Sequence, residues 1–172
     1  MRARGHRLER PRCGACAHSI AFTFSQSREH LYFTIWRGIA DLANGTLRYA
    51  GGGHPPAIVR AAQHGNPKLL ASGPPVGCFA NAKYPTVEMP LYFPTELYLF
   101  PDGVFETRRH QDEVPLDRLV DFLVAPRNGR GRTVAEIRDR TLEHLHGTPP
   151  PDDCSVLKVL LTDRHPCQSF PP

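Results

Sequence analysis

The stretch FTIWRGIADLANGTLRYAGGGHPPAIV, residues 33–59, decides the fold, because it joins three strand-like segments through two sharp turns. LYFTIWRGIAD is rich in β-forming residues and predicts a strand, and Asn44-Gly45 is typical of a tight hairpin turn. TLRYA predicts the returning strand, so we expect a β-hairpin over residues 31–50. After the interruption GGGHPP, the segment AIVRA predicts a third strand.

Further strands and two helices follow along the chain. LYFP and ELYLF, within residues 91–100, predict strands, and apolar residues at helical spacing predict a helix over residues 116–123. Thr133 and Glu136 form a capping-box pattern for a second helix, which Gly147 is expected to end. DDCSVLKVLL, at the end of this region, has a near-continuous apolar run that predicts a buried strand. Strands first, then helices, then a last strand indicate an α+β fold.

The length and charge of the chain limit the classes of function. The chain has 172 residues, enough for one domain with a core, and no apolar run of membrane-spanning length. Six Arg and two Glu in the first 30 residues account for the whole net charge of +4, so the rest has no basic surplus of the kind that nucleic-acid binders carry. We expect no nucleic acid or membrane among its partners.

The two ends of the chain differ from its middle. Residues 1–20 are Arg-rich and lack a helix or strand period, which is compatible with a disordered arm, a targeting peptide or a spurious leader; we favour a disordered or spurious leader. Residues 163–172 are expected to form a flexible tail. Cys13 and Cys16 resemble half of a zinc site, but a structural zinc site needs four ligands and no second pair follows. Five Cys without a signal peptide indicate a reducing cytoplasm.

Two pairs of residues at predicted strand ends could bind a metal. In LYLFPDGVFE, residues 97–106, Asp102-Gly103 follows a strand, and Asp152-Asp153 precedes the last strand. Carboxylates grouped without Cys or His favour hard cations such as Mg²⁺ or Mn²⁺. Taken alone, however, Asp-Gly is far more often a turn, and Asp-Asp before a strand is usually a solvated loop.

His54 lies in the segment AGGGHPP. The three Gly allow positive φ, and the two Pro stiffen the exit of the turn. A shaped turn formed by Gly53 and His54 is therefore a better interpretation than a catalytic histidine.

Four segments stand in a fixed order: residues 33–59, SGPPVG at 72–77, LYLFPDGVFE at 97–106, and DDCSVLKVLL at 152–161. Together they resemble the C-terminal two-thirds of the metal-dependent protein phosphatases of PPM type (type 2C), and more closely the bacterial stage II sporulation E branch. The resemblance implies a partial phosphatase domain over residues 21–162. It also implies an incomplete αββα sandwich, in which helices flank two antiparallel sheets.

The same resemblance implies chemistry. Family members hold two Mn²⁺ or Mg²⁺ ions at one end of the sandwich, and a bridging water attacks the phosphorus of a phosphoserine or phosphothreonine. Two divalent ions lower the pKa of that water and clamp the phosphoryl oxygens. The implied substrate is a phosphorylated bacterial regulator, such as an anti-sigma-factor antagonist, in signal transduction.

The site residues carry over one by one. Asp102 and Asp152 match metal ligands of the family, and Gly103 stands beside the first of them. Asp153 matches a second acidic position that fixes the loop. His54 and Gly53 match the family's Ala-Gly-His-Pro-Pro turn near the site, for which no catalytic role is implied. No side chain is assigned as a catalytic group.

Two departures from the family pattern keep other functions open. Pro101 stands where the family usually has Thr or Ser, and Pro fixes φ, so it can re-aim Asp102. The family's N-terminal Gly-Asp motif, which bridges both metals, has no counterpart before Leu31. One alternative is therefore a catalytically inactive, truncated remnant that acts as a binding module; another is a small β-rich module without phosphatase ancestry. An open sheet edge would also make self-association possible.

Overall fold

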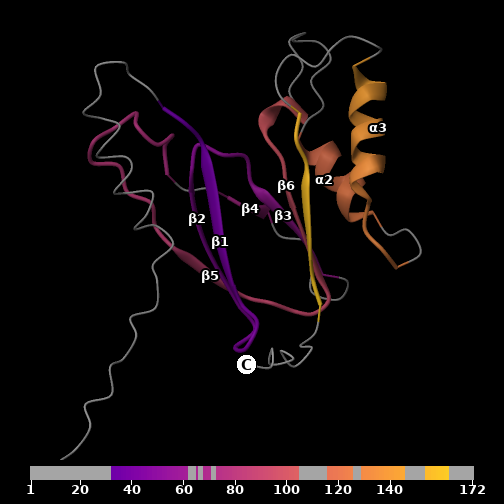
Figure 1. Ribbon diagram of the computed structural model, residues 1–172, viewed down its shortest axis with the longest axis horizontal. Coiled ribbons are helices and arrows are strands. Elements are labelled where there is room, and N and C mark those ends of the chain that lie inside the picture. The colour runs from indigo at the N-terminus through magenta and orange to yellow at the C-terminus, as the bar shows by residue number, and fades with distance from the viewer. Residues whose placement is uncertain are drawn as a thin grey trace, which may run out of the picture.

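The computed structural model describes residues 32–61, 65, 68–70, 73–104, 116–125, 129–145 and 154–162. Its elements in chain order are β1 (Ile35–Asp41), β2 (Thr46–Gly52), β3 (Ala57–Ala61), β4 (Lys68–Leu69), β5 (Val87–Pro90), β6 (Thr95–Leu99), the short 3₁₀ helix η1 (Asp102–Val104), α2 (Leu116–Val124), α3 (Val134–His144) and β7 (Leu157–Leu161). One sheet has the order β1-β2-β5 and the other the order β4-β3-β6-β7, and all pairs are antiparallel. Both helices lie on the face of the second sheet that points away from the first (Figure 1). No helix in these ranges is long and apolar enough to span a membrane.

The hairpin predicted from the opening stretch is confirmed. β1 and β2 pair from Ile35 opposite Gly52 to Asp41 opposite Thr46. Gly45 in the turn has a φ of +63°, a conformation that glycine adopts without steric cost. The carboxylate of Asp41 accepts hydrogen bonds from the backbone and side-chain nitrogens of Asn44, at 3.0 and 2.7 Å. These contacts fix the length of the turn and with it the register of the two strands.

The prediction of a strand at LYFP, residues 91–94, is wrong. The strand in this region is β5, which comes just before it and pairs with β2. Residues 91–94 instead carry the chain from the first sheet to the second, with a cis peptide bond between Phe93 and Pro94. Leu91 and Phe93 are apolar because they pack into the core between the sheets.

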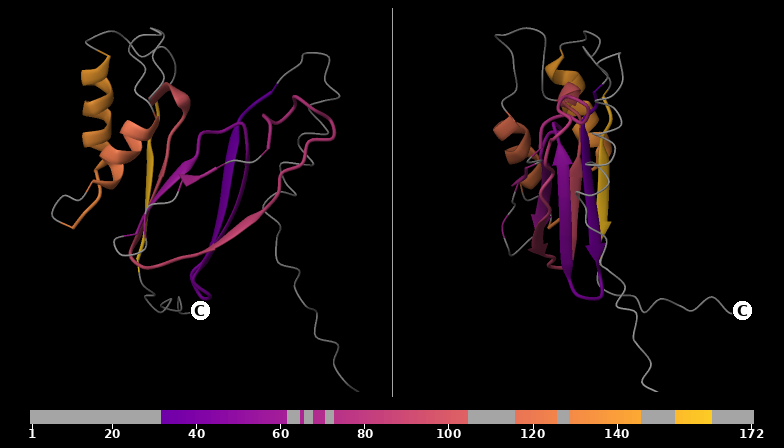
Figure 2. Two further views of the ribbon diagram at one scale, coloured as in Figure 1. Left: turned by 180° about the vertical axis from the view of Figure 1, so that it is seen from behind. Right: turned by 90° about the vertical axis from the view of Figure 1, so that its left-hand side faces the viewer.

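The core between the two sheets is built by alternate residues of facing strands. β3 contributes Ala57, Val59 and Ala61 to it, and β2 contributes Leu47 and Tyr49. The intervening residues of β3 and β6 face the helices, where Ile58 and Tyr98 are fully buried. The second sheet is thus covered on both faces, and Figure 2 shows the resulting layers from two further sides.

The predicted helices are confirmed, each with its apolar face toward the second sheet. Leu119, Val120 and Leu123 of α2 are buried there, together with Ile137 of α3. α3 begins with the complete capping box that the sequence predicted, from Thr133 and Glu136. It ends with Leu145 as the C-cap, and Gly147 lies outside the described residues.

The last strand forms as predicted, but it is not fully buried. β7 pairs with β6 alone and lies at the edge of the sheet as far as the structure describes it. Val159 and Leu161 pack against the core between the sheets, whereas Leu157 and Leu160 are each 57% exposed. The prediction failed because a continuous apolar run does not distinguish a central strand from an edge strand.

A cluster of charged residues lies beneath the segment that leads into α3. Glu96 of β6 stands opposite Arg60 of β3, and its carboxylate accepts a hydrogen bond from the Arg60 guanidinium at 3.1 Å. The Lys158 ammonium of β7 lies 2.8 Å from the other carboxylate oxygen, and the Tyr98 hydroxyl lies 3.1 Å from the first. Glu96 and Arg60 are each only 8% exposed.

The same four side chains bind the backbone of residues 129–132. The Gly131 amide donates to Glu96, Lys158 donates to the Arg132 carbonyl at 3.0 Å, and Arg60 reaches the Gly129 carbonyl. A Cβ on Gly131 would lie 1.9 Å from a Glu96 carboxylate oxygen, so only glycine fits at this contact. The cluster therefore joins β3, β6 and β7 to the start of α3.

The environment of Glu96 stabilises its ionised form. Burial by itself raises the pKa of the Glu96 carboxyl, but the hydrogen bond and charge of Lys158, with hydrogen bonds from Tyr98 and Arg60, outweigh burial and lower the pKa below its usual value. A carboxyl with a lowered pKa stabilises the fold above its unfolded pKa of about 4.3. That contribution is lost as the pH falls through the lower, folded value.

We expect Glu96→Gln to lower the free energy of unfolding at pH 7 by about 3 kcal/mol, because Arg60 and Lys158 would stay buried without a counter-ion. The variant should also lose less stability than the parent as the pH falls below about 4.3, since it lacks the carboxyl that becomes protonated there. Urea unfolding across this pH range measures both effects. Glu88→Gln, which changes an exposed carboxylate 4.0 Å from Arg48, is the control and should change stability by less than about 0.5 kcal/mol. Parallel acid profiles for the parent and Glu96→Gln would contradict this role of the cluster.

Candidate metal centre

Asp102 lies in the turn that ends β6. After Leu99 the chain passes through Phe100 and Pro101 into η1, where the Val104 amide donates to the Pro101 carbonyl at 3.3 Å. Phe100 and Val104 are buried in the core under the helices, at 2% and 7% exposure, while Asp102 between them is exposed. The two apolar residues anchor the turn on the inside, so the carboxylate-bearing residue is held at the surface of the strand end.

The turn with His54 connects the two sheets. β2 ends at Gly52 in the first sheet, and β3 begins at Ala57 in the second. Gly53 has a φ of +64°, and the Nδ1 of His54 lies 2.8 Å from the Pro55 carbonyl oxygen. Because a carbonyl only accepts, Nδ1 is the donor in this hydrogen bond.

The segment Gly73–Val76 lies against this turn. Gly53 donates to the Gly73 carbonyl at 2.8 Å, and Gly73 donates to the Gly51 carbonyl at 3.0 Å. Tyr84 covers the contact: a Cβ on Gly73 would lie 2.4 Å from its ring. Burial raises the pKa of the Tyr84 hydroxyl, with a further rise from the charge of Cys78. Gly53 and Gly73 have to be small because the two backbone segments that contain them meet under the Tyr84 ring.

Antiparallel pairing brings three of these features to one end of the sandwich. β3 starts where β6 ends, with Ile58 opposite Tyr98, and β7 also starts there, with Leu157 opposite Leu99. The His54 turn, the Asp102 turn and the beginning of β7 therefore share the upper end of the molecule in Figure 1. Gly103 lies in η1 beside Asp102.

Several predicted site residues lie outside the described residues. These are Asp152 and Asp153, and likewise Cys13 and Cys16 of the zinc alternative. The described chain resumes at Cys154, one residue after Asp153 in the sequence, at the same end as Asp102. Within the described ranges no three His, Cys, Asp or Glu side chains come together to hold a metal ion. Asp102 is thus the one predicted carboxylate ligand whose position the structure gives.

The architecture is that of the PP2C phosphatase domains. Over 87% of this chain and 67% of theirs, the phosphatase domain of the cell fate determinant SpoIIE from Bacillus subtilis matches with a TM-score of 0.62 and 18% identity. A manganese-presoaked form of that domain matches with a TM-score of 0.61, and RsbX in complex with magnesium with 0.55, at 13% identity over 84% of this chain and 62% of that one. The predicted α+β class, an incomplete sandwich of two antiparallel sheets with helices, is confirmed.

The sequence itself defines the family. The family model of stage II sporulation protein E (SpoIIE) matches residues 4–161, and the chain belongs to that family. The resemblance found in the sequence is confirmed, and a β-rich module without phosphatase ancestry is excluded. Protein IcfG of Synechocystis sp. is 26% identical over 131 residues, 75% of this chain. The chain spans about a fifth of the length of that relative.

Sequence reasoning missed two groups of residues. The cluster around Glu96 had one visible signal: each of AIVRA, ELYLF and VLKVLL carries a charged residue within an apolar strand. A row of basic residues shared by α2 and α3, including Arg118 and Arg140, had no such signal, because the two helices meet only in the folded chain.

We expect Gly53→Ala to destabilise the protein by more than Gly45→Ala. Both glycines have positive φ, for which alanine costs about 1 kcal/mol. At Gly53 the new Cβ would also lie 2.6 Å from Pro75, whereas at Gly45 the nearest atom is 3.6 Å away. The additional loss at Gly53 should be about 1–3 kcal/mol in urea unfolding. Equal losses of stability in the two variants would show that Gly53 and Pro75 are not in tight contact at this turn.

Proposed function

We propose that the chain is a metal-dependent phosphatase domain that hydrolyses phosphoserine or phosphothreonine in a protein. The observation that supports this most is the exposed Asp102, held by Phe100 and Val104 at the end of β6, in a chain of the SpoIIE family. The start of β7 lies at that same end, directly after Asp152 and Asp153 in the sequence.

The proposed metal ligands are Asp102 and Asp152, with Gly103 beside the first and Asp153 fixing the loop. Carboxylate oxygens suit Mn²⁺ or Mg²⁺, and two related structures carry these metals in their descriptions, a manganese-presoaked SpoIIE domain and a magnesium complex of RsbX. When bound, such ions supply an activated water and charge stabilisation for phosphoryl transfer. The chain itself then has to orient the carboxylates, which the anchoring of η1 does for Asp102.

The substrate we propose is a phosphorylated bacterial regulator, such as an anti-sigma-factor antagonist, in cytoplasmic signal transduction. Family membership supports the class of phosphoprotein, and no basic surplus outside the first 30 residues points to nucleic acid. Self-association through the outer edge of β7 is part of the same proposal, since the exposed Leu157 and Leu160 flank that edge.

A second candidate is a catalytically inactive binding module with the same fold. It is favoured by Pro101 directly before Asp102, because Pro fixes φ and can re-aim the carboxylate. A two-metal site needs several carboxylates, and Asp102 is the one proposed ligand that the structure describes.

We expect the purified chain to hydrolyse p-nitrophenyl phosphate when Mn²⁺ is present, and Asp102→Asn to lower kcat at least about 100-fold, because an amide is a poor ligand for a hard cation. Mn²⁺ should also raise the melting temperature of the parent more than that of the variant. Asp121→Asn, an exposed carboxylate on α2, is the control and should retain full activity.

If Asp121→Asn lost activity as well, the loss in Asp102→Asn would not be specific, and the assignment of Asp102 as a metal ligand would be contradicted. A folded parent that neither hydrolyses the ester nor responds to Mn²⁺ would favour the binding module.

A further inference from the structure

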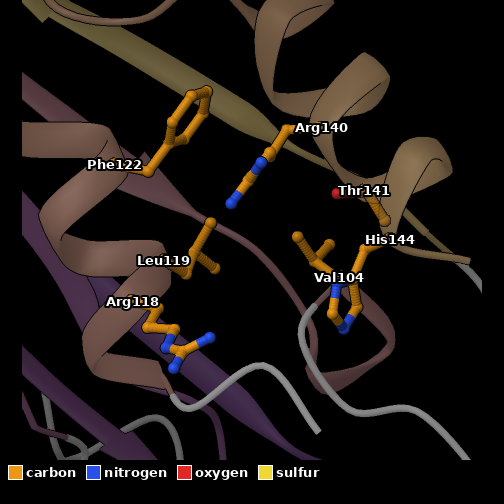
Figure 3. Close-up of a pocket in the computed structure, with 7 residues that line it drawn as sticks. All are labelled: Val104, Arg118, Leu119, Phe122, Arg140, Thr141 and His144. Atoms are coloured by element: carbon orange, nitrogen blue, oxygen red, sulfur yellow. The ribbon is translucent and has the colours of Figure 1, made fainter. Parts of the chain in front are cut away.

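A groove between α2 and α3 opens beside the turn that carries Asp102 (Figure 3). Its apolar lining comes from Leu119 and Phe122 of α2 and from Val104 of η1. Its basic lining comes from Arg118 of α2 and from Arg140 and His144 of α3. In Figure 3 the side chains of the two helices extend toward one another across this space.

In the described part of the chain the two groove arginines form no ion pair, unlike Arg60 and Arg138. Within the described residues, Arg118 forms neither a hydrogen bond nor an ion pair, and the Arg140 guanidinium lies over the Phe122 ring, 5.8 Å from its centre. Arg138, on another face of α3, pairs with Asp139 at 2.7 Å. Unpaired positive charge is therefore concentrated at the groove.

A third guanidinium lies beside the groove, but its charge is paired, since Arg132 lies 3.7 Å from a carboxylate oxygen of Glu136. Arg132 lies 4.4 Å from the centre of the Phe122 ring, so this one aromatic side chain has two arginines over it. Like charges around a partly apolar surface repel one another, and an anionic ligand relieves that repulsion. The floor between the arginines is apolar because Leu119 and Val104 belong to the core under the helices.

We propose that this groove binds an acidic segment of the phosphoprotein substrate, with a leucine or aromatic side chain on the apolar floor and carboxylates facing Arg118 and Arg140. The inference rests on the proposed function, and it adds a docking site to it. Val104 lines the groove two residues after Asp102, so a segment bound here holds the adjoining chain close to the candidate metal centre. The groove then selects the substrate, while Asp102 takes part in the chemistry.

Binding can be tested without metal and without turnover. A short fluorescein-labelled peptide in which Asp and Glu alternate with Leu and Phe is titrated with the protein, and fluorescence anisotropy is recorded. We expect Arg118→Gln/Arg140→Gln to raise Kd about tenfold and Arg138→Gln to leave it unchanged. A peptide with Ser in place of Leu and Phe should bind more weakly than the first.

Equal affinity of the groove variant and the parent would overturn the proposal, and so would equal affinity of the two peptides. Tighter binding of a single-stranded oligonucleotide than of the acidic peptide, sensitive to the same double variant, would show that the groove takes nucleic acid instead.

A kinetic experiment distinguishes substrate docking in the groove from catalysis at the metal centre. The acidic peptide is extended by a phosphoserine, and Mn²⁺-dependent release of phosphate is measured against p-nitrophenyl phosphate. Arg118→Gln/Arg140→Gln should raise KM for the peptide about tenfold while kcat/KM for the small ester stays unchanged. An equal loss on both substrates would overturn the docking role. If neither substrate is hydrolysed while the peptide binds through the arginines, the proposed function fails and the assignment of the groove as an acidic-peptide site stands.

Discussion

The ion cluster around Glu96 is the constraint that fixes how β3, β6 and β7 of the second sheet pair with one another. Its three charged members come from β3, β6 and β7, and they meet on the helix-facing side of the sheet. A shift of one residue in any of these strands would move a charge into the apolar core between the sheets. Taking charges out of water is costly, so the cluster contributes more to a unique register than to net stability.

That register reaches the candidate metal centre through short covalent connections. β6 leads within three residues to Asp102, and β7 starts opposite the end of β6. The cluster also binds the backbone of residues 129–132, which leads directly into α3 and so sets one wall of the groove. The site and the groove are therefore placed by the same three strands, although neither contains a residue of the cluster.

Local sequence signals predicted the elements whose boundaries are encoded locally. The hairpin follows from Asn44-Gly45 and the start of α3 from Thr133 and Glu136, since each of these depends on a few adjacent residues. The failures lie where distant segments decide the outcome. LYFP has strand-like composition but crosses between sheets, and the exposed edge of β7 depends on which neighbours its sheet has. For the site, Asp102-Gly103 is indistinguishable from a turn by pattern, and only the ordered motifs of the family gave it a role.

The second anchor of the site end is steric rather than electrostatic. The chain leaves the first sheet at Gly52 and enters the second at Ala57, and the intervening turn is held by backbone hydrogen bonds to Gly73 and covered by Tyr84. The two anchors act at different places: the Glu96 cluster orders the second sheet, and the glycine contact holds the turn by which the chain passes from the first sheet to the second. A carboxylate that binds a metal ion must be oriented before the ion arrives, because reorganisation on binding reduces affinity. The two anchors hold strands and a turn at the end of the sandwich where the Asp102 turn lies, and the groove between α2 and α3 contains no residue of either anchor.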